Sequence, residues 1–215
     1  MIDIQRDAEH RYSVNGANFV SVTTVIGSTI RKPALERWLG ELGNAEAERV
    51  RTKAASHGTL VHALAALVVE GVPSIPMGDE DAPAQAQLDA FTDWYEQYVA
   101  EVYAVELMVA NYPAQYAGAL DFLLRFKGDK EPTVVDVKSG KGLYREMNLQ
   151  TSAYREATLP LLGDYGFTKK ACRRGILHVP MDADGPARFH EHTNHTQDYG
   201  AFLACLHLYR YLRGV

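Results

Sequence analysis

The chain has 215 residues, of which 47% are hydrophobic and 23% charged, so we expect one substantial core and a single domain over residues 1–215. Its two cysteines, Cys172 and Cys205, are too few for a disulfide framework or a four-cysteine cluster, and no apolar run reaches the ~18 residues of a membrane span. The net charge of −5 weighs against a nucleic-acid partner, because phosphate neutralisation is the usual source of affinity.

The N-terminal portion is predicted to be helical. A proline opens residues 33–42, and proline is tolerated in the first turn of a helix. Asn44 can cap a second helix that runs to about residue 55. A third, apolar helix carries His62 and ends at Gly71, a residue type that is common at helix C-termini.

A loop and a longer helix are expected next. Residues 71–83 are rich in glycine, proline and aspartate, which is typical of a loop. Residues 84–102 are predicted to form an amphipathic helix, because large apolar side chains recur there at helical spacing. These side chains are Leu88, Phe91, Tyr95, Tyr98 and Val102.

Three strands are predicted in the middle of the chain, over residues 103–110, 116–126 and 133–138. The segments between them, 111–114 and 127–132, contain the asparagine, proline, glycine and aspartate that favour turns. The strands therefore form an antiparallel meander within a central mixed sheet. If each hairpin is centred on its turn, acidic residues on the three strands face one another: Glu106 opposite Asp121, and Asp121 opposite Asp136.

The third strand contains the most informative pair of residues. Asp136 and Lys138 are two positions apart, so they share one face of a strand. A charged pair in so apolar a segment is costly to desolvate unless it has a partner or a function. Opposed residues on neighbouring strands have Cβ atoms roughly 5 Å apart, so the three carboxylates and the lysine would cluster.

Such a cluster needs a cation among its carboxylates or a proton on one of them. The alternative is that Glu106 and Asp121 are solvated positions on a half-exposed sheet. The apolar neighbours of Asp121, in Gly118–Leu124, argue against that alternative more strongly for Asp121 than for Glu106.

The remainder of the chain completes an α/β (α+β) fold with helices flanking the sheet. A helix is predicted around residues 150–154, followed by two antiparallel strands over 174–179 and 187–192 and a closing helix over 196–212. The closing helix has an apolar stripe that is expected to be core, with an oligomer interface as the alternative. The stripe consists of Phe202, Cys205, Leu206, Tyr209 and Leu212.

Four short motifs occur in an order that resembles one family of enzymes. Each pattern alone is weak, but four in this order at plausible spacings are specific. They are Gly58-x-x-x-His62, Gly118-x-x-Asp121, Asp136-x-Lys138-x-Gly140 and Gln150-x-x-x-Tyr154. In these motifs the chain resembles the PD-(D/E)xK nuclease superfamily, and more narrowly its RecB-like exonuclease branch. The resemblance extends from about residue 21 to residue 154, and the opening segments 12–16 and 21–25 resemble phage-encoded members.

The resemblance implies a restriction-endonuclease-like core with a metal site at the mouth of the sheet. His62, Asp121 and Asp136 would match the metal ligands, with the backbone carbonyl of Val137 as a further oxygen donor. Glu106 has a less regular counterpart, which would bind a second metal or a ligand-bound water. Oxygen-rich ligation suits Mg²⁺ or Mn²⁺, and the histidine shifts the preference slightly toward Mn²⁺.

The same resemblance implies roles in catalysis. Lys138 would match the catalytic lysine, which orients or deprotonates the attacking water or stabilises charge in the transition state. Gln150 and Tyr154 would match the motif of the following helix that lines the site and contacts the DNA backbone. The metal would polarise the scissile phosphate and acidify a water.

The histidines have competing interpretations. A lone histidine on an apolar helix is usually a hydrogen-bonded core residue, and only the other motifs favour His62 as a ligand. His57 is not aligned with His62, so a structural role is assigned to it. The run His190–His195 fits no zinc-ligand spacing and reads instead as part of a strand.

Basic residues gather in four clusters despite the acidic total. Charge clusters are most often solvated surfaces, but the third flanks the proposed site in a glycine-containing loop, where it could reach a phosphate. The clusters are Arg31, Lys32 and Arg37; Arg49, Arg51 and Lys53; Lys138, Lys141 and Arg145; and Lys169, Lys170, Arg173 and Arg174.

The sequence therefore predicts a Mg²⁺- or Mn²⁺-dependent deoxyribonuclease, in particular an exonuclease that degrades linear DNA in phage recombination, replication or repair. Two other classes stay open: a catalytically silent DNA-end-binding or protein-interaction module on the same fold, and a metal-dependent hydrolase of small phosphoesters. The presence of both Asp121 and Lys138 argues against the silent module. The expected partners are DNA with free ends, and a second copy or a recombination protein; no membrane contact is expected. No signal peptide is recognised, so a cytoplasmic location is expected.

Overall fold

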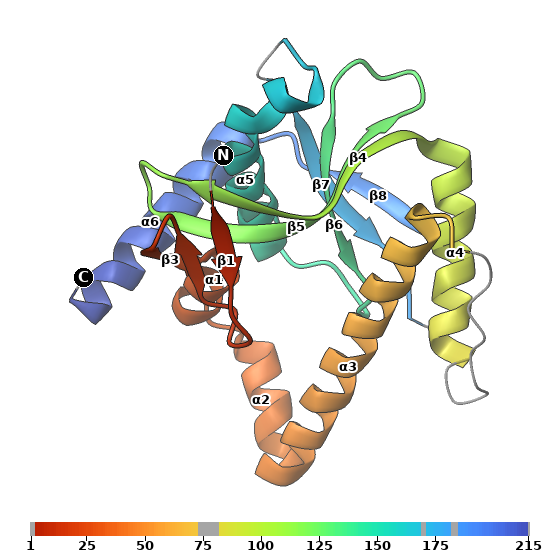
Figure 1. Ribbon diagram of the computed structural model, residues 1–215. Helices are drawn as coiled ribbons and strands as arrows, with labels where there is room; N and C mark the ends of the chain where they lie inside the picture. The colour runs from red at the N-terminus through yellow and green to blue at the C-terminus, as the bar shows by residue number, and fades with distance from the viewer. Residues whose placement is uncertain (1–2, 73–81, 169–170, 182–184, 215) are drawn as a thin grey trace.

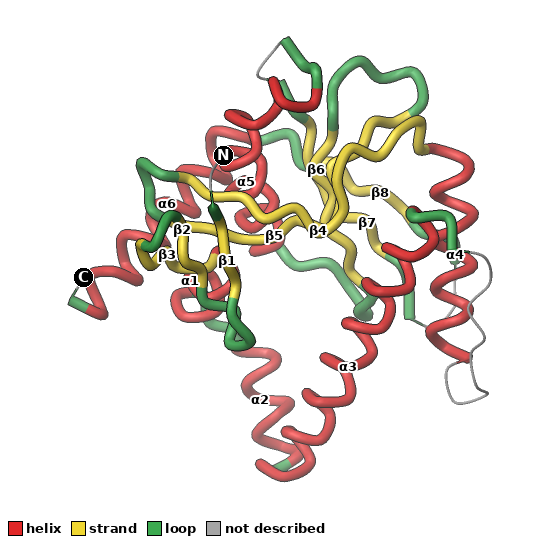
Figure 2. Tube along the Cα trace, viewed as in Figure 1, coloured by secondary structure: helices red, strands yellow, loops and turns green. Residues whose placement is uncertain are grey.

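The computed structural model describes residues 3–72, 82–168, 171–181 and 185–214 (Figures 1 and 2). Over these residues the protein is an α/β structure with an open, mixed eight-stranded sheet and six α-helices. The strands are β1 Ile4–Arg6, β2 Tyr12–Val14, β3 Ala17–Ser21, β4 Val99–Asn111, β5 Tyr116–Phe126, β6 Thr133–Lys138, β7 Arg173–His178 and β8 Arg188–Glu191. The helices are α1 Val22–Thr29, α2 Pro33–Leu42, α3 Asn44–Val69, α4 Ala82–Tyr98, α5 Glu146–Thr158 and α6 His195–Arg213, with a 3₁₀ helix at Leu159–Tyr165.

Strand β5 is the centre of the sheet, because three strands pair with it. Strand β4 runs antiparallel along one of its edges. The other edge is shared: β3 pairs in parallel with its first two residues, Tyr116 and Ala117, and β6 pairs antiparallel with Phe122–Leu124. In the described sheet, residues 118–121 of β5 lie between these two ladders without a partner on that edge. We call this break in the sheet the fork.

Helices cover both faces of the sheet. Helices α1, α5 and α6 pack on one face, where Val25, Ala153 and Phe202 meet Leu123 and Val134 of the sheet in one hydrophobic cluster. Helices α3 and α4 pack on the other face in a second cluster. That cluster includes Ala65, Phe91, Phe122, Val135 and Leu177. In Figure 1, α2 and the first half of α3 extend away from these layers as a V-shaped pair.

The predicted antiparallel meander is confirmed, including its register. The β4–β5 ladder keeps the predicted pairing on both sides of Glu106, so that residue lies across from Asp121. The β5–β6 ladder pairs Phe122 with Val135, which places Asp121 next to Asp136 on the adjoining strand. The two turn segments therefore set the relative positions of the three carboxyl groups, as the sequence indicated.

The meander is irregular at the point where these acids lie. Glu106 has a φ of 51°, which is uncommon for a residue other than glycine and especially so within a strand. On β5, Leu120 and Leu123 belong to the same hydrophobic cluster, although residues three apart in a regular strand point to opposite faces. Both strands thus depart from regular pleating beside the fork, and such departures are common next to functional sites.

Three predictions about the helical part of the chain need correction. The first is that the N-terminal portion is helical. Three short strands, β1–β3, precede the first helices, and a hairpin turn at Asn15-Gly16 joins two of them. Asparagine followed by glycine is a strong hairpin signal, and both residues have the positive φ that such turns require. The strands are only three to five residues long, which is too short for a clear alternating pattern.

The second and third corrections concern helix boundaries. The two helices predicted on either side of Ala55 are one helix, α3, of 26 residues. The second half of α3 packs on α4 and on the sheet, and this packing keeps the helix continuous at Gly58. Helix α4 ends at Tyr98 instead of residue 102, because the β-branched stretch from Val99 onward pairs with β5.

The other predicted elements agree with the structure. Helices α2 and α6 and strands β5 to β8 lie within one or two residues of their predicted bounds, and β8 is one residue shorter at each end. In the apolar stripe of α6, Phe202 and Leu206 are buried and Cys205 and Tyr209 pack beside them, whereas Leu212 is 66% exposed. Residues 73–81 and 182–184, predicted as parts of loops, lie outside the described residues.

A buried arginine links three elements, so one member of the fourth basic cluster is not a solvated surface residue. Arg174 of β7 is completely buried; it pairs with Asp198 of α6 at 2.5 Å and donates to Thr151 and to the carbonyl of Asn148 on α5. Its neighbour Arg173 pairs with Glu191. Arg174 is therefore a structural residue that DNA cannot reach, while Lys169 and Lys170 lie outside the described residues.

Among the helices that the structure describes, none combines the length and the apolar character that crossing a bilayer requires.

Candidate metal centre

The motif residues converge at the fork from both layers of helices. Helix α3 supplies His62 from one face of the sheet, and α5 supplies Gln150 and Tyr154 from the other. The sheet itself supplies the acids and the lysine. Because β3 and β6 separate at residues 118–121 of β5, side chains from both faces can reach the same point. Figure 1 shows α3 and α5 on either side of the strands that meet there.

Three side chains form a group that could hold a metal ion. His62, Glu106 and Asp121 each offer one ligand atom, and these atoms all lie within 4.8 Å of one another. Nδ1 of His62 is 3.2 Å from Oδ1 of Asp121. In the described part of the chain, this is the one group of three histidine, cysteine or acidic side chains whose ligand atoms lie this close together.

Asp121 connects this group to the neighbouring strand. It is 8% exposed, and its second oxygen, Oδ2, accepts a hydrogen bond from the backbone N–H of Val137 at 2.5 Å. Val137 therefore contacts the centre through its N–H, whereas the resemblance assigned a role to its carbonyl. The contact holds the carboxylate against β6.

Asp136 lies beside the three-residue group but is not one of its members. It is 3% exposed, and its Oδ1 accepts a hydrogen bond from Nε2 of Gln150 at 2.8 Å. Its Oδ2 forms an ion pair with the ammonium of Lys138. A carboxylate oxygen has two acceptor sites, so one lone pair of this oxygen is left for a cation.

The charges of the centre shift its pKa values in opposite directions. Burial opposes ionisation of Asp121, but the hydrogen bond and the charge of His62, together with Lys138, lower its pKa. Burial raises the pKa of Asp136; Lys138 opposes this shift, and the nearby Asp121 adds to it. Burial also raises the pKa of Glu106, and Asp121 adds to that shift. Acidic groups with such opposed environments are characteristic of sites that bind cations or transfer protons.

The two basic groups respond to the same carboxylates. Burial lowers the pKa of His62, but the hydrogen bond and charge of Asp121 outweigh it, so the net shift is upward. Burial likewise opposes the charged form of Lys138, and the charges of Asp136 and Asp121 raise its pKa above its usual value. The centre thus holds negative charge in excess, which attracts cations.

Two of the motifs are in steric contact. Tyr154 is 3% exposed, and its ring lies against Gly118. A Cβ at position 118 would be 2.4 Å from Cε1 of Tyr154, so a side chain there would displace the ring. Gln150 also donates to the hydroxyl of Tyr154 at 3.2 Å. The glycine of the second motif is therefore explained by the tyrosine of the fourth.

A supporting residue, Gln87, was not found by sequence reasoning. This side chain of α4 is completely buried; its amide donates to the carbonyl of Ser139 at 3.2 Å and to that of Val179 at 2.7 Å. Its oxygen is 2.5 Å from Nε2 of His57, so the predicted structural role of His57 has a defined partner. Ser139 follows Lys138 directly, and Gln87 thereby holds the end of β6. A glutamine one turn before Phe91, on the apolar face of the helix, is the signal that could have indicated it.

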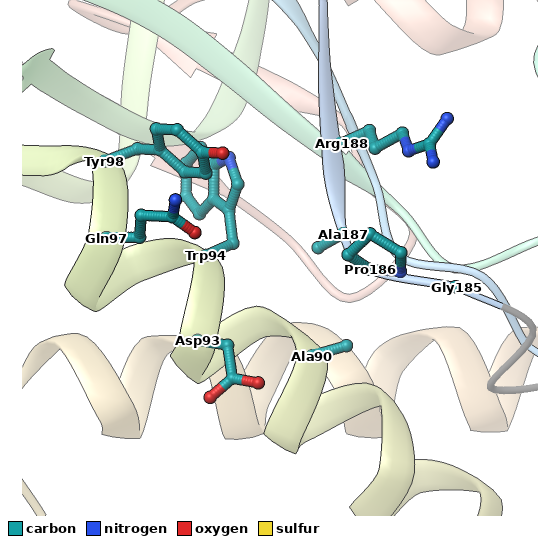
Figure 3. A pocket seen from close by; sticks show the side chains of 9 residues that line it. All are labelled: Ala90, Asp93, Trp94, Gln97, Tyr98, Gly185, Pro186, Ala187 and Arg188. Carbon is teal, nitrogen blue, oxygen red and sulfur yellow. The ribbon is translucent and has the colours of Figure 1, made fainter.

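The other candidate features lie elsewhere. His192 contacts Thr151 and His195 contacts Arg174, so these histidines belong to the interface between β7, α5 and α6. A surface cavity of about 500 Å³ lies between α4, with Trp94 and Tyr98, and the segment that leads to Arg188. Figure 3 shows the side chains that line it. A second cavity of about 510 Å³ adjoins it along β8. Neither cavity is lined by a motif residue.

The residues present fit a divalent cation of the Mg²⁺ or Mn²⁺ type. The donor set combines carboxylate oxygens with one imidazole, and it lies where side chains from two layers converge. In comparisons with known proteins, no protein-family model matches the chain and no curated protein matches it.

Proposed function

We propose that the protein is a metal-dependent deoxyribonuclease with a restriction-endonuclease-like core, of the RecB-like exonuclease type within the PD-(D/E)xK superfamily. The observation that carries this proposal is the meeting of the four motifs at the fork. His62, Asp121, Asp136 and Gln150 come from four different elements, and each contacts another member of the set or its immediate neighbour. Glu106 is exposed, so a substrate can reach the group from solvent on that side.

The metal would be held by His62, Glu106 and Asp121, with Asp136 alongside. When bound, it would supply polarisation of the scissile phosphate and a lower pKa for a water molecule. The chain itself brings the negative charge that retains the cation. The N–H of Val137 and the amide of Gln150 fix the two buried carboxylates, so these groups need little rearrangement on binding.

Lys138 and the α5 pair complete the proposed catalytic group. The ammonium of Lys138 pairs with Asp136 and lies on the same strand face, where it can orient the attacking water or stabilise charge on the phosphate. Gln150 bridges Asp136 and Tyr154, so it fixes the distance between β6 and α5. Phosphodiester hydrolysis depends mainly on such positioning and on electrostatic stabilisation.

A direct test incubates the purified protein with end-labelled linear DNA and with closed circular DNA, in Mg²⁺, Mn²⁺ or EDTA. We expect metal-dependent loss of the linear form while the circle is largely spared. Asp136→Ala and Lys138→Ala should each lower the rate by at least ~10²-fold, as expected for a positioned electrostatic or acid–base group.

Two surface substitutions serve as controls: Asp89→Ala on α4 and Lys130→Ala in the β5–β6 turn, both exposed. They should leave the rate within about twofold, because exposed side chains away from a site change little. Similar cutting of linear and circular DNA would reject the exonuclease assignment. Metal-independent activity, or full activity of the Asp136→Ala protein, would reject the proposed centre.

A further inference from the structure

An exposed aromatic side chain lies in the loop that leaves the proposed centre. The loop, residues 139–145, joins Lys138 at the end of β6 to the start of α5, whose next turn carries Gln150. Tyr144 is the most exposed large apolar side chain of this loop, at 57%, and Leu143 beside it is 37% exposed. Exposed aromatic groups next to a reaction centre are candidates for ligand contact.

The backbone of Tyr144 is anchored although its side chain is exposed. The Tyr144 backbone N–H donates to the sulfur of Met147 at 3.4 Å, and the Tyr144 carbonyl accepts from the N–H of Met147 at 3.0 Å. The ammonium of Lys32 lies 5.8 Å from the ring centroid and is itself held by Glu146 at 2.8 Å. An anchored backbone lowers the entropy lost when a flat ligand stacks on the solvent-facing ring.

The surroundings of Tyr144 are basic. Lys141 and Arg145, in the same loop, are both exposed, and Lys32 adds a third cation from the start of α2. Among these neighbours Glu146 is the single acid, and it is paired with Lys32. An aromatic platform with cations around it is the combination that binds unpaired nucleic-acid strands: the ring stacks on a base and the cations neutralise phosphates.

We infer that Tyr144, with Lys141 and Arg145, forms a binding site for an unpaired DNA strand and stacks one of its bases. This inference rests on the proposed nuclease function, which it deepens by naming the substrate class: a strand that is single-stranded where it enters the centre. Inside a fully paired duplex the bases stack on one another, so the ring of Tyr144 has no base face to contact there. The site selects strand ends that are already unpaired or that fray.

The inference is tested by binding instead of cleavage. The full-length protein is titrated in EDTA into a fluorescein-labelled oligothymidylate of about 12 nucleotides, and fluorescence anisotropy gives the dissociation constant. Tyr144→Ala should weaken binding by about 5- to 150-fold, as expected for the loss of one base–aromatic stack. Tyr144→Phe should bind within about twofold of wild type, because the ring is retained, whereas Tyr144→Leu should behave like Tyr144→Ala.

Two further arms separate stacking from phosphate contact and from general surface effects. An oligonucleotide of the same length with abasic sites should bind wild type as weakly as oligothymidylate binds the Tyr144→Ala protein. Tyr211→Ala removes a tyrosine that is 78% exposed on α6 and should leave binding unchanged. Affinity for a closed circular duplex should differ by less than about twofold between wild type and Tyr144→Ala.

Failure of this inference is distinct from failure of the proposed function. If Tyr144→Ala binds oligothymidylate as tightly as wild type, or if wild type does not bind it, the strand-binding site is overturned, whatever the cleavage assay shows. If binding follows the expected pattern but linear DNA is not degraded, the site is supported and the nuclease proposal fails.

Discussion

At the scale of single residues, the centre depends on how closely its groups are packed. Asp121 and Asp136 are both nearly buried, yet their pKa values move in opposite directions. Burial raises both, but the contact with His62 outweighs it at Asp121, whereas at Asp136 the charge of Asp121 adds to it. Val137 and His62 hold the carboxylate of Asp121, and Gln150 and Lys138 hold that of Asp136. Small displacements of the neighbouring side chains would therefore change the arrangement of ligands.

Gly118→Ala tests this dependence. The added Cβ would be 2.4 Å from the Tyr154 ring, so the ring must move away from β5. We expect a loss of about 1–3 kcal/mol in the free energy of unfolding, typical of overpacking, and a lower nuclease rate. Chemical denaturation in urea measures the first quantity and the linear-DNA assay the second.

Gly200→Ala on α6 is the matched control for Gly118→Ala, because a Cβ there meets nothing within 4 Å. It should leave the nuclease rate unchanged and stability equal or slightly higher. The Gly118→Ala and Tyr154→Ala double mutant should show a coupling energy of about 0.5–3 kcal/mol in a double-mutant cycle. Additive effects would mean that the two motif residues do not contact each other.

At the scale of elements, the site is held by the packing of α3 and α4 as much as by the sheet. Gln87 of α4 contacts His57 of α3 and the carbonyls of Ser139 and Val179, which follow β6 and β7. The backbone N–H of Val179 also donates to the carbonyl of Lys138 at 2.9 Å. One buried amide thus joins four elements directly behind the proposed catalytic lysine.

Gln87→Leu should destabilise the protein by about 2 kcal/mol or more, because it leaves a histidine and two carbonyls without their buried partner. The unfolding free energy in urea is the measurement. Gln87→Glu should also destabilise, since a carboxylate cannot donate to the two carbonyls. Gln85→Leu, two residues earlier on the same helix and only partly buried, should change stability by less than about 0.5 kcal/mol. Equal effects at positions 85 and 87 would contradict the role assigned to Gln87.

At the scale of the whole molecule, the proposed ligands connect parts of the chain that are far apart in sequence. His62 belongs to the layer of α3 and α4, whereas Glu106 and Asp121 belong to the sheet. An ion shared by these residues binds only the folded protein, because unfolding separates the ligands. Metal binding should therefore stabilise the whole domain.

Addition of Mn²⁺ at about 100 times its dissociation constant should contribute about 2.7 kcal/mol. For a domain of this size that corresponds to a rise of roughly 5–11 °C in Tm. Differential scanning fluorimetry with and without EDTA measures the shift. Asp121→Asn should abolish most of it, whereas Asp89→Asn on the surface of α4 should retain it. The same Tm for wild type in Mn²⁺ and in EDTA would argue against a metal site.

Much of the central fold was determined by the sequence alone. The alternating and apolar stretches of β5 and β6, with turn residues between them, predicted their bounds and their register, and hence the proximity of Glu106, Asp121 and Asp136. These features are local: strand period and turn chemistry depend on residues close in sequence.

Only the tertiary structure decided the fork, the continuity of α3, the early end of α4 and the role of Gln87. Each depends on contacts between segments that are distant in the chain: β3 with the start of β5, α3 with α4, β4 with β5, and an amide of α4 with the ends of β6 and β7. A local pattern cannot encode such partners, because packing and pairing with remote segments override the propensity of a short stretch.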